Sequence, residues 1–185
     1  MRKVFVFNLI TLDGFFEGPN QDISWHNADN QEFGDFAIEQ LAEIDTILFG
    51  RVTYEMMATF WPSKEALEAD PETAKFMNEK EKFVFSHTLN SADWNNTTLI
   101  KTDAADEIRK LKAQEGKAIA IFGSSDLTLS LIDSDVIDEY RLLVNPLFIG
   151  DGKRFLQGLT KRFDLKLINS RVFESGNVLL TYTKK

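Results

Sequence analysis

The chain has 185 residues, a formal net charge of −8 at pH 7 and an apolar content of 43%. A chain of this length buries roughly 70% of the surface that its unfolded form exposes, which is enough to enclose a ligand cleft in one domain. We predict a single domain over residues 1–185. The acidic charge and the absence of a long basic run argue against nucleic acid and anionic membrane surfaces as partners.

The residue types that the chain lacks narrow the chemistry further. It has no cysteine, which excludes disulfides, thiolate nucleophiles and thiolate-ligated metals, and its two histidines, His26 and His87, leave little for other metals. We predict no metal site. The apolar run near the N-terminus is too short for a signal peptide, and no apolar stretch approaches the ~20 residues that span a bilayer. We therefore expect a cytoplasmic protein without a membrane segment.

Taken in chain order, short apolar runs typical of buried strands alternate with amphipathic helical patterns. The predicted strands of this part cover residues 3–10, 46–49, 83–85, 98–100 and 118–122. The predicted helices cover residues 29–43, 53–60, 72–80, 103–115 and 126–132. The polar segment 61–72 predicts a loop. Such alternation indicates a mainly parallel sheet with helices on both faces.

The pattern changes after Asp135, where strands follow one another without a long helix between them. Residues 138–144, 164–173 and 178–183 are typical of strands, and the last two flank 174–177, a Glu-Ser-Gly-Asn turn sequence typical of hairpins. We expect an antiparallel hairpin to close the sheet at one edge. The whole pattern predicts a mixed α/β fold of three layers, α/β/α.

In open α/β sheets ligands bind beyond the carboxyl ends of the strands, so the residues that follow each strand are the first site candidates. Gly50, Arg51 and Thr53 follow the strand at 46–49. Glycine permits a close backbone approach, the helix N-terminus offers N–H groups and the arginine adds a cation, so this segment suits a phosphate. The alternative is a glycine turn followed by a surface arginine.

Two further strand ends carry small polar residues. The segment Gly123-Ser124-Ser125-Asp126 follows strand 118–122 and has the order of a phosphate cradle, namely strand, glycine-serine turn and helix. It is neither Gly-x-Gly-x-x-Gly nor a Walker loop, and one of its serines can instead cap the helix. Ser86 and His87 follow strand 83–85, where an exposed loop histidine is the alternative to a ligand contact.

The loop after the first strand has glycines and aromatic residues that can cover a flat ligand, among them Phe16, Gly18 and Trp25. For Trp25 the alternative is ordinary packing. Asp13 and Asp29 are the candidate acids, and helix N-capping is the alternative for each.

Four segments, in this order, resemble the dihydrofolate reductase-like superfamily and, within it, the C-terminal reductase domain of the bifunctional riboflavin-biosynthesis deaminase/reductase. They are Thr11-Leu12-Asp13-Gly14, Gly50-Arg51-x-Thr53-Tyr54, Ile121-Phe122-Gly123-Ser124-Ser125-x-Leu127, and Ile137-Asp138-Glu139-Tyr140 with Pro146-x-x-Ile149-Gly150-x-Gly152-Lys153. The resemblance covers nearly the whole chain. It implies a dihydrofolate reductase-like fold with NADPH lying across the carboxyl edge of the sheet.

Carried over by position, the resemblance implies a set of site residues. At the cofactor phosphates and ribose it implies Gly50, Arg51, Thr53, Gly123, Ser124, Ser125 and Asp126, with Ser86 and His87 near the adenosine 2′-phosphate. Around the nicotinamide it implies Leu9, Ile10, Phe16 and Gly18. On the substrate side it implies Asp29 as the catalytic acid, beside Trp25, Phe33 and Met56.

One departure from the resemblance concerns the substrate. Phe122 stands where the riboflavin-type reductase has a substrate-binding glutamate, which argues against that substrate. Our leading hypothesis is an NADPH-dependent reductase that passes hydride to a small flat, pterin- or pyrimidine-like molecule, with a proton from Asp29 or water. The alternative is a nucleotide-binding sensor or interaction protein without efficient reductase chemistry. We also expect a homodimer formed through the terminal strands.

Overall fold

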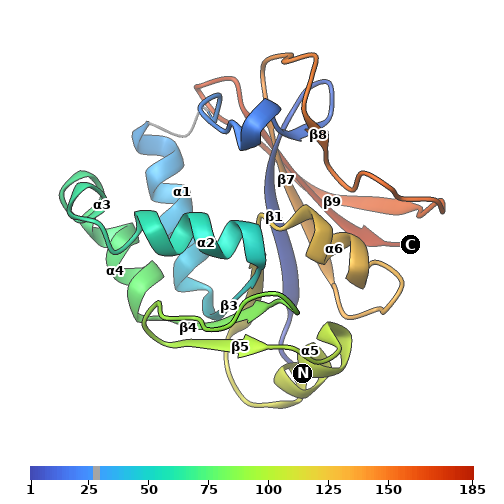
Figure 1. The fold of residues 1–185 in the computed structure, drawn as a ribbon. Helices are drawn as coiled ribbons and strands as arrows, with labels where there is room; N and C mark the ends of the chain where they lie inside the picture. The colour runs from blue at the N-terminus through green and yellow to red at the C-terminus, as the bar shows by residue number, and fades with distance from the viewer. Residues whose placement is uncertain (27–29) are drawn as a thin grey trace.

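The computed structural model describes residues 1–26 and 30–185, and its centre is a mixed eight-stranded sheet (Figure 1). The strands are β1 (Val4–Thr11), β3 (Ile44–Gly50), β4 (Glu81–Phe85), β5 (Thr97–Ile100), β6 (Ala118–Phe122), β7 (Glu139–Asn145), β9 (Leu165–Val172) and β10 (Val178–Lys184). Their order is β5-β4-β3-β6-β1-β7-β10-β9. Those from β5 to β7 are parallel, whereas β10 is antiparallel to both β7 and β9.

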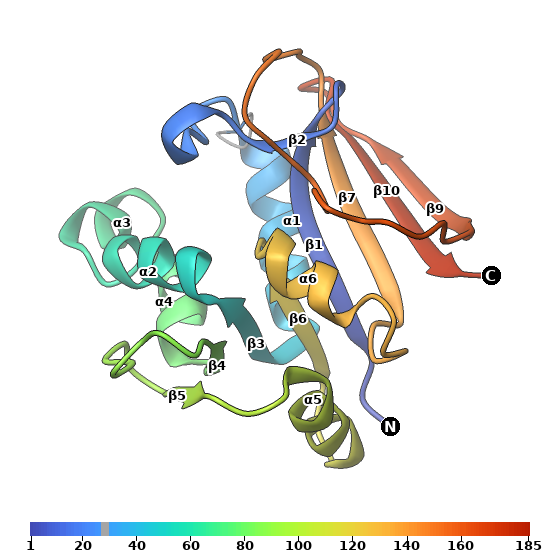
Figure 2. The ribbon, with the colours of Figure 1, turned by 45° about the vertical axis from the view of Figure 1, so that its right-hand side comes forward.

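Helices cover both faces of this sheet. They are α1 (Gln31–Ala42), α2 (Arg51–Phe60), α3 (Lys64–Ala69), α4 (Pro71–Glu79), α5 (Ala104–Ala113) and α6 (Ser125–Leu131). Phe36 of α1 and Met77 of α4 belong to one hydrophobic core, and Leu111 of α5 and Leu131 of α6 belong to the other. Figure 1 shows α1 and α6 on opposite sides of β1, and in the turned view of Figure 2 α6 lies in front of α1. The three-layer α/β/α prediction is confirmed.

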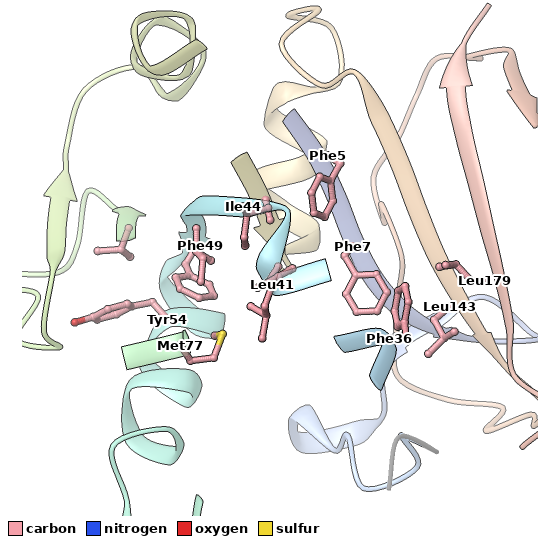
Figure 3. Close-up of a cluster of buried hydrophobic side chains, with 14 of the residues drawn as sticks. Phe5, Phe7, Phe36, Leu41, Ile44, Phe49, Tyr54, Met77, Leu143 and Leu179 are labelled. Carbon is pink, nitrogen blue, oxygen red and sulfur yellow. The ribbon is translucent and has the colours of Figure 1, made fainter. Parts of the chain in front are cut away.

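The central strand β1 shows how the sequence builds the two cores. Successive side chains of a strand point to opposite faces, so Phe5 and Phe7 join the core on the α1 side, while Val4 and Val6 join the core on the α6 side. Figure 3 shows Phe7 next to Phe36 of α1, and their ring centroids are 5.8 Å apart. A strand covered on both faces is apolar throughout, which explains the continuous apolar run at residues 4–7.

The C-terminal hairpin forms as the sequence predicts. Strands β9 and β10 pair along their length, and the N–H of Phe173 donates to the carbonyl of Asn177 at 2.9 Å across the turn. Gly176 has a φ of +86°, which glycine adopts without strain. The antiparallel edge of the sheet is thereby confirmed.

The prediction of a loop over residues 61–72 is wrong, because α3 lies inside it. Ser63 caps this helix, with its Oγ accepting from the N–H of Ala66 at 3.2 Å, and Ala66 is fully buried. Asp70 then ends α3 and caps α4, accepting from the N–H of Thr73 at 3.0 Å. The many charged residues of α3 make the segment look like a polar loop, although Ser63 at its start and Asp70 at its end are typical helix-terminus residues.

Candidate functional site

A large cavity opens at the carboxyl ends of β1, β3, β4 and β6 and runs between α1 and α2. Its volume of about 1210 Å³ exceeds the ~300–1,000 Å³ typical of a pocket for one small ligand. Most of the predicted site residues line it. They are Leu9, Phe16, Phe33, Gly50, Arg51, Thr53, Met56, Ser86, His87, Gly123, Ser124, Ser125 and Asp126.

Two predicted nicotinamide neighbours that the structure describes, Ile10 and Gly18, do not line this cavity. Ile10 lies one residue beyond the stretch of β1, residues 7–9, that lines the cavity. The N–H of Gly18 donates to the carbonyl of Asp22 at 2.8 Å within a tight turn. The cofactor role of both residues remains a prediction.

Trp25, which was expected at the substrate, does not line the cavity, whereas its neighbour His26 does. The substrate contact of Trp25 remains a prediction. The indole Nε1 of Trp25 donates to the carbonyl of Asp22 at 3.0 Å, and its ring packs edge-on against His26, which lines the cavity. Burial lowers the pKa of His26 to about 4, so this imidazole is neutral at pH 7. Asp29, the predicted catalytic acid, lies outside the described residues.

The loops after β3 and β6 are tied together by hydrogen bonds. The N–H of Gly50 donates to Ser124 Oγ at 2.8 Å, and the N–H of Ser124 donates to Thr53 Oγ1 at 3.1 Å. Ser124 has a left-handed backbone and makes no side-chain cap to α6, so the helix-capping alternative does not apply to it. These bonds hold the two glycine turns in direct contact with each other in the cavity wall.

The N-terminus of α2 gives this end of the cavity its electrostatic character. Gly50 is its N-cap and has no side chain, so the first-turn N–H groups have no side-chain cap. Such groups and the helix dipole attract anions. Arg51 adds a cation in the first turn, half-exposed and bonded to Glu55 at 2.8 Å, an exposed pair that a phosphate can displace.

At the end of β4, Ser86 has a structural task. Its Oγ accepts from the N–H groups of Thr88 and Leu89, both at 3.1 Å, which closes the turn that carries His87. The N–H of Ser86 donates to the carbonyl of Ile100 in β5 at 3.0 Å. The serine therefore fixes the loop, and both Ser86 and His87 line the cavity, so the cofactor contact of each stays a prediction.

Asp13, the second candidate acid, has a structural role as well. It accepts from the hydroxyl of Thr11 at 2.6 Å and from the N–H of Gly150 at 2.9 Å. These bonds, the Thr11 bond above all, hold the pKa of Asp13 below its ordinary value, so it stays ionised. It joins the turn after β1 to the 149–150 loop and does not cap a helix. Two of the segments that carry the family resemblance are thus in direct contact.

Sequence reasoning missed a buried polar residue in the cavity wall. Asn8 lines the cavity from the middle of β1 and is 1% exposed, and neither polar atom of its amide has a hydrogen-bond partner within the described part of the chain. An isolated asparagine inside an apolar strand is the sequence signal that points to it. Burying such a group without partners costs free energy.

Replacing Asn8 with leucine is expected to raise the free energy of unfolding by about 1 kcal/mol, because the change removes an unpaired buried amide and keeps the branched skeleton of the side chain. Asn145 is the matched control, since its buried amide donates to the carbonyls of Ile10 and Leu143 at 3.3 Å. Asn145→Leu is expected to lower stability. Urea denaturation of both variants measures the difference, and equal destabilisation by the two changes would contradict the role given to Asn8.

Other features of the described residues bear on the class of site. Over residues 1–26 and 30–185, no group of three or more His, Asp or Glu side chains is placed to hold a metal ion. In the same ranges no helix is both long and apolar enough to cross a bilayer. The cavity offers backbone N–H groups, hydroxyls, an arginine and aromatic walls.

The sheet order and the cleft at its carboxyl edge are those of a dihydrofolate reductase-like fold. The model of the RibD C-terminal domain family matches residues 2–179, and the chain belongs to this family. Over 182 residues it is 35% identical to the uncharacterised protein YyaP of Bacillus subtilis strain 168, covering 98% of this chain and 94% of that protein.

Solved structures show the same fold at low sequence identity. A Shewanella sp. PV-4 protein assigned to riboflavin biosynthesis superposes with a TM-score of 0.76 at 23% identity, over 99% of both chains. Dihydrofolate reductase of Enterococcus faecalis superposes with a TM-score of 0.62 at 13% identity, over 99% of this chain and 96% of that one. The dihydrofolate reductase-like fold predicted from the four segments is confirmed.

Proposed function

We propose that this protein is an NADPH-dependent reductase that transfers a hydride to a small flat substrate. The observation that carries the proposal is one continuous cavity with an anion-attracting end, at Arg51 and the N-terminus of α2, and an apolar end, at Phe33 and Met56. Membership of the RibD C-terminal domain family supports a reductase. The dihydrofolate reductase of similar fold was solved with NADP(H), which supports the choice of cofactor.

The residues at the anion-attracting end fit a dinucleotide. A Cβ on Gly123 would lie 3.1 Å from Thr53 Cγ2 and 3.7 Å from Phe16 Cζ, so the glycine keeps the cleft floor clear. Arg51 and the first-turn N–H groups of α2 would hold the phosphates, and His87 would meet the adenosine 2′-phosphate. Bound NADPH supplies the hydride.

The chain itself has three remaining tasks in such a reaction. Leu9 and Phe16 would border the nicotinamide, and Phe33 with Met56 would hold the substrate flat and exclude water. A proton must also reach the substrate, and we propose Asp29 as its donor, with water as the alternative. A cytoplasmic location and a homodimer also remain predictions.

Arg51→Gln is expected to weaken the binding of NADPH and of NADH alike, each by about ten-fold, because it removes one charge from the shared pyrophosphate. His87→Ala is expected to weaken NADPH and leave NADH unchanged. Tryptophan fluorescence titration of the full chain measures both affinities. Glu55→Gln is the control, since it frees Arg51 of its ion-pair partner and leaves the cationic site intact.

Absence of saturable binding of either nucleotide at millimolar concentration would refute the reductase. Saturable binding of NADPH without its oxidation, across a panel of pterins, pyrimidines and quinones, would favour the sensor or interaction protein. Oxidation by one member of the panel would establish the activity and identify a substrate class.

A further inference from the structure

The apolar end of the cavity carries information about the substrate that the cofactor end does not. It is the part of the cavity that α1, α2 and the α3–α4 pair line, which we call the substrate arm. Its apolar lining includes Ala37 of α1, Met56, Met57 and Phe60 of α2, Trp61 directly after α2, and Met77 of α4. Resting on the proposed reductase function, we infer that the substrate is an uncharged aromatic molecule without a phosphate or carboxylate group.

The distribution of charge in the cavity carries this inference. Among the described lining residues, the lysine and arginine side chains are Arg51 and Lys153, and both belong to the cofactor end. Lys153 bonds to Asp126 at the start of α6, at 2.7 Å. In the described part of the substrate arm, the charged lining residue is Asp70, which is acidic and already caps α4.

An anionic substrate group would therefore enter the arm without a positive partner. Taking a charge out of water without a partner is strongly unfavourable, and Asp70 would add repulsion. An uncharged aromatic substrate would bind favourably in the arm, because the Met57 thioether and the Trp61 indole pack well against aromatic rings. The arm thus selects against charge and in favour of aromatic surface.

Of two buried polar residues in the arm, Thr73 and Gln40, Thr73 defines the polar atom that such a substrate needs. Thr73 lines the arm at 6% exposure, and its Oγ1 has no hydrogen-bond partner within the described residues. Gln40 is 4% exposed, and its Oε1 accepts from Arg141 Nη1 at 3.3 Å. A neutral hydroxyl or carbonyl on the ligand can pair with the Thr73 hydroxyl, which both donates and accepts. The substrate class is a flat neutral ring system with at least one such oxygen.

A pair of naphthalene probes tests the inference on the full chain. 2-Naphthol is neutral at pH 7 and carries a hydroxyl, whereas 2-naphthalenesulfonate has the same ring system and a negative charge. Calorimetric titration is expected to show 2-naphthol binding at least about ten-fold more tightly than the sulfonate. Thr73→Val is expected to weaken 2-naphthol about three-fold, since it removes the unpaired hydroxyl at constant volume.

A lysine introduced into the substrate arm tests whether the missing positive charge is what excludes anions, and a lysine outside the cavity is the matched control. Met56 lines the arm and is 39% exposed, so Met56→Lys is tolerated and should tighten the sulfonate about five-fold. Leu67 on α3 is 48% exposed and does not line the cavity, so Leu67→Lys adds the same charge without changing the preference.

The results separate this inference from the reductase proposal. Equal or tighter binding of the sulfonate by the unmodified chain, or no binding of 2-naphthol at millimolar concentration, would overturn the neutral-substrate inference. A parallel NADPH titration reports on the cofactor end alone. Failure of NADPH to bind, with 2-naphthol bound as expected, would refute the reductase and leave the assignment of the arm in place.

Discussion

Gly152→Ala is expected to lower the free energy of unfolding by about 4 kcal/mol, the largest effect of an alanine substitution at any of the ten glycines. A Cβ at this position would lie 2.2 Å from the carbonyl oxygen of Glu17 and 2.8 Å from Gly18 Cα, both backbone atoms. The φ of Gly152 is +134°, a value that other residues rarely adopt. The added methyl would part the small sheet formed by β2 (Phe15–Glu17) and β8 (Lys153–Arg154).

Two other glycines separate the steric clash from the backbone strain. Gly150 has a φ of +75° but open space at its Cβ position, so Gly150→Ala should cost about 1 kcal/mol, from strain alone. Gly34 lies inside α1 with nothing within 4 Å, and Gly34→Ala should raise stability by about 0.5–1 kcal/mol. Thermal and urea unfolding of the three variants measures the change in the free energy of unfolding for each. Similar losses for Gly152→Ala and Gly150→Ala would refute the clash.

Arg141→Met is expected to lower the free energy of unfolding by about 3 kcal/mol at pH 7, because it leaves a buried carboxylate short of its main partner. Arg141 Nε bonds to Glu139 at 2.7 Å, and the two side chains are 12% and 7% exposed. The guanidinium also lies 3.8 Å from the ring centroid of Phe5 and bonds to Glu43 at 3.1 Å. Lys3 still reaches Glu139, at 2.9 Å, so the loss is partial.

The pH dependence of this loss identifies its cause. Burial raises the pKa of Glu139, but hydrogen bonds from Arg141 and Lys3 outweigh burial and hold that pKa below its ordinary 4.5. The ionised pair therefore adds stability above pH 4.5, and that stability is lost as the pH falls through the lowered pKa. In Arg141→Met burial prevails and the pKa rises, so the difference from the unmodified chain should shrink as Glu139 becomes protonated.

Two variants control the Arg141 experiment. Glu139→Gln combined with Arg141→Met removes the stranded carboxylate and should recover part of the stability. Arg162 bonds to Asp164 with its own side chain 85% exposed, and Arg162→Met should change stability by less than about 0.5 kcal/mol. A loss in Arg141→Met that is constant from neutral to acidic pH would show that packing on Phe5, and not the ion pair, is responsible.

Most of the fold could be predicted because its central strands are buried on both faces and helices such as α5 carry a clear cap. The run at residues 4–7 can only be a central strand, and Asp103 caps α5 with its carboxylate 2.9 Å from the N–H of Asp106. Strands β2 and β8 could not be predicted, since each is very short and their pairing depends on Gly152 lying against Glu17.

The site residues that directly follow a strand could be predicted from the sequence, whereas those inside strands and helices could not. Gly50 and Gly123 stand directly beyond β3 and β6, so the carboxyl-edge rule brings them to one cavity. Asn8 and Thr73 come from the interior of a strand and from a helix, where only packing decides which side chains reach a cleft. No local pattern separates Leu9, which lines the cavity, from Ile10, which does not.

The position of β1 at the middle of the sheet has a consequence for synthesis of the chain. Phe5 lies beside Ala120 of β6 and Glu139 of β7, so β1 is synthesised well before either of the strands that pair with it. Until both partners emerge, Val4, Val6 and the phenylalanines of β1 remain without a sheet, and such exposed apolar strands aggregate readily. Folding is therefore expected to complete only after most of the chain is translated, at the slow rate typical of distant strand pairing.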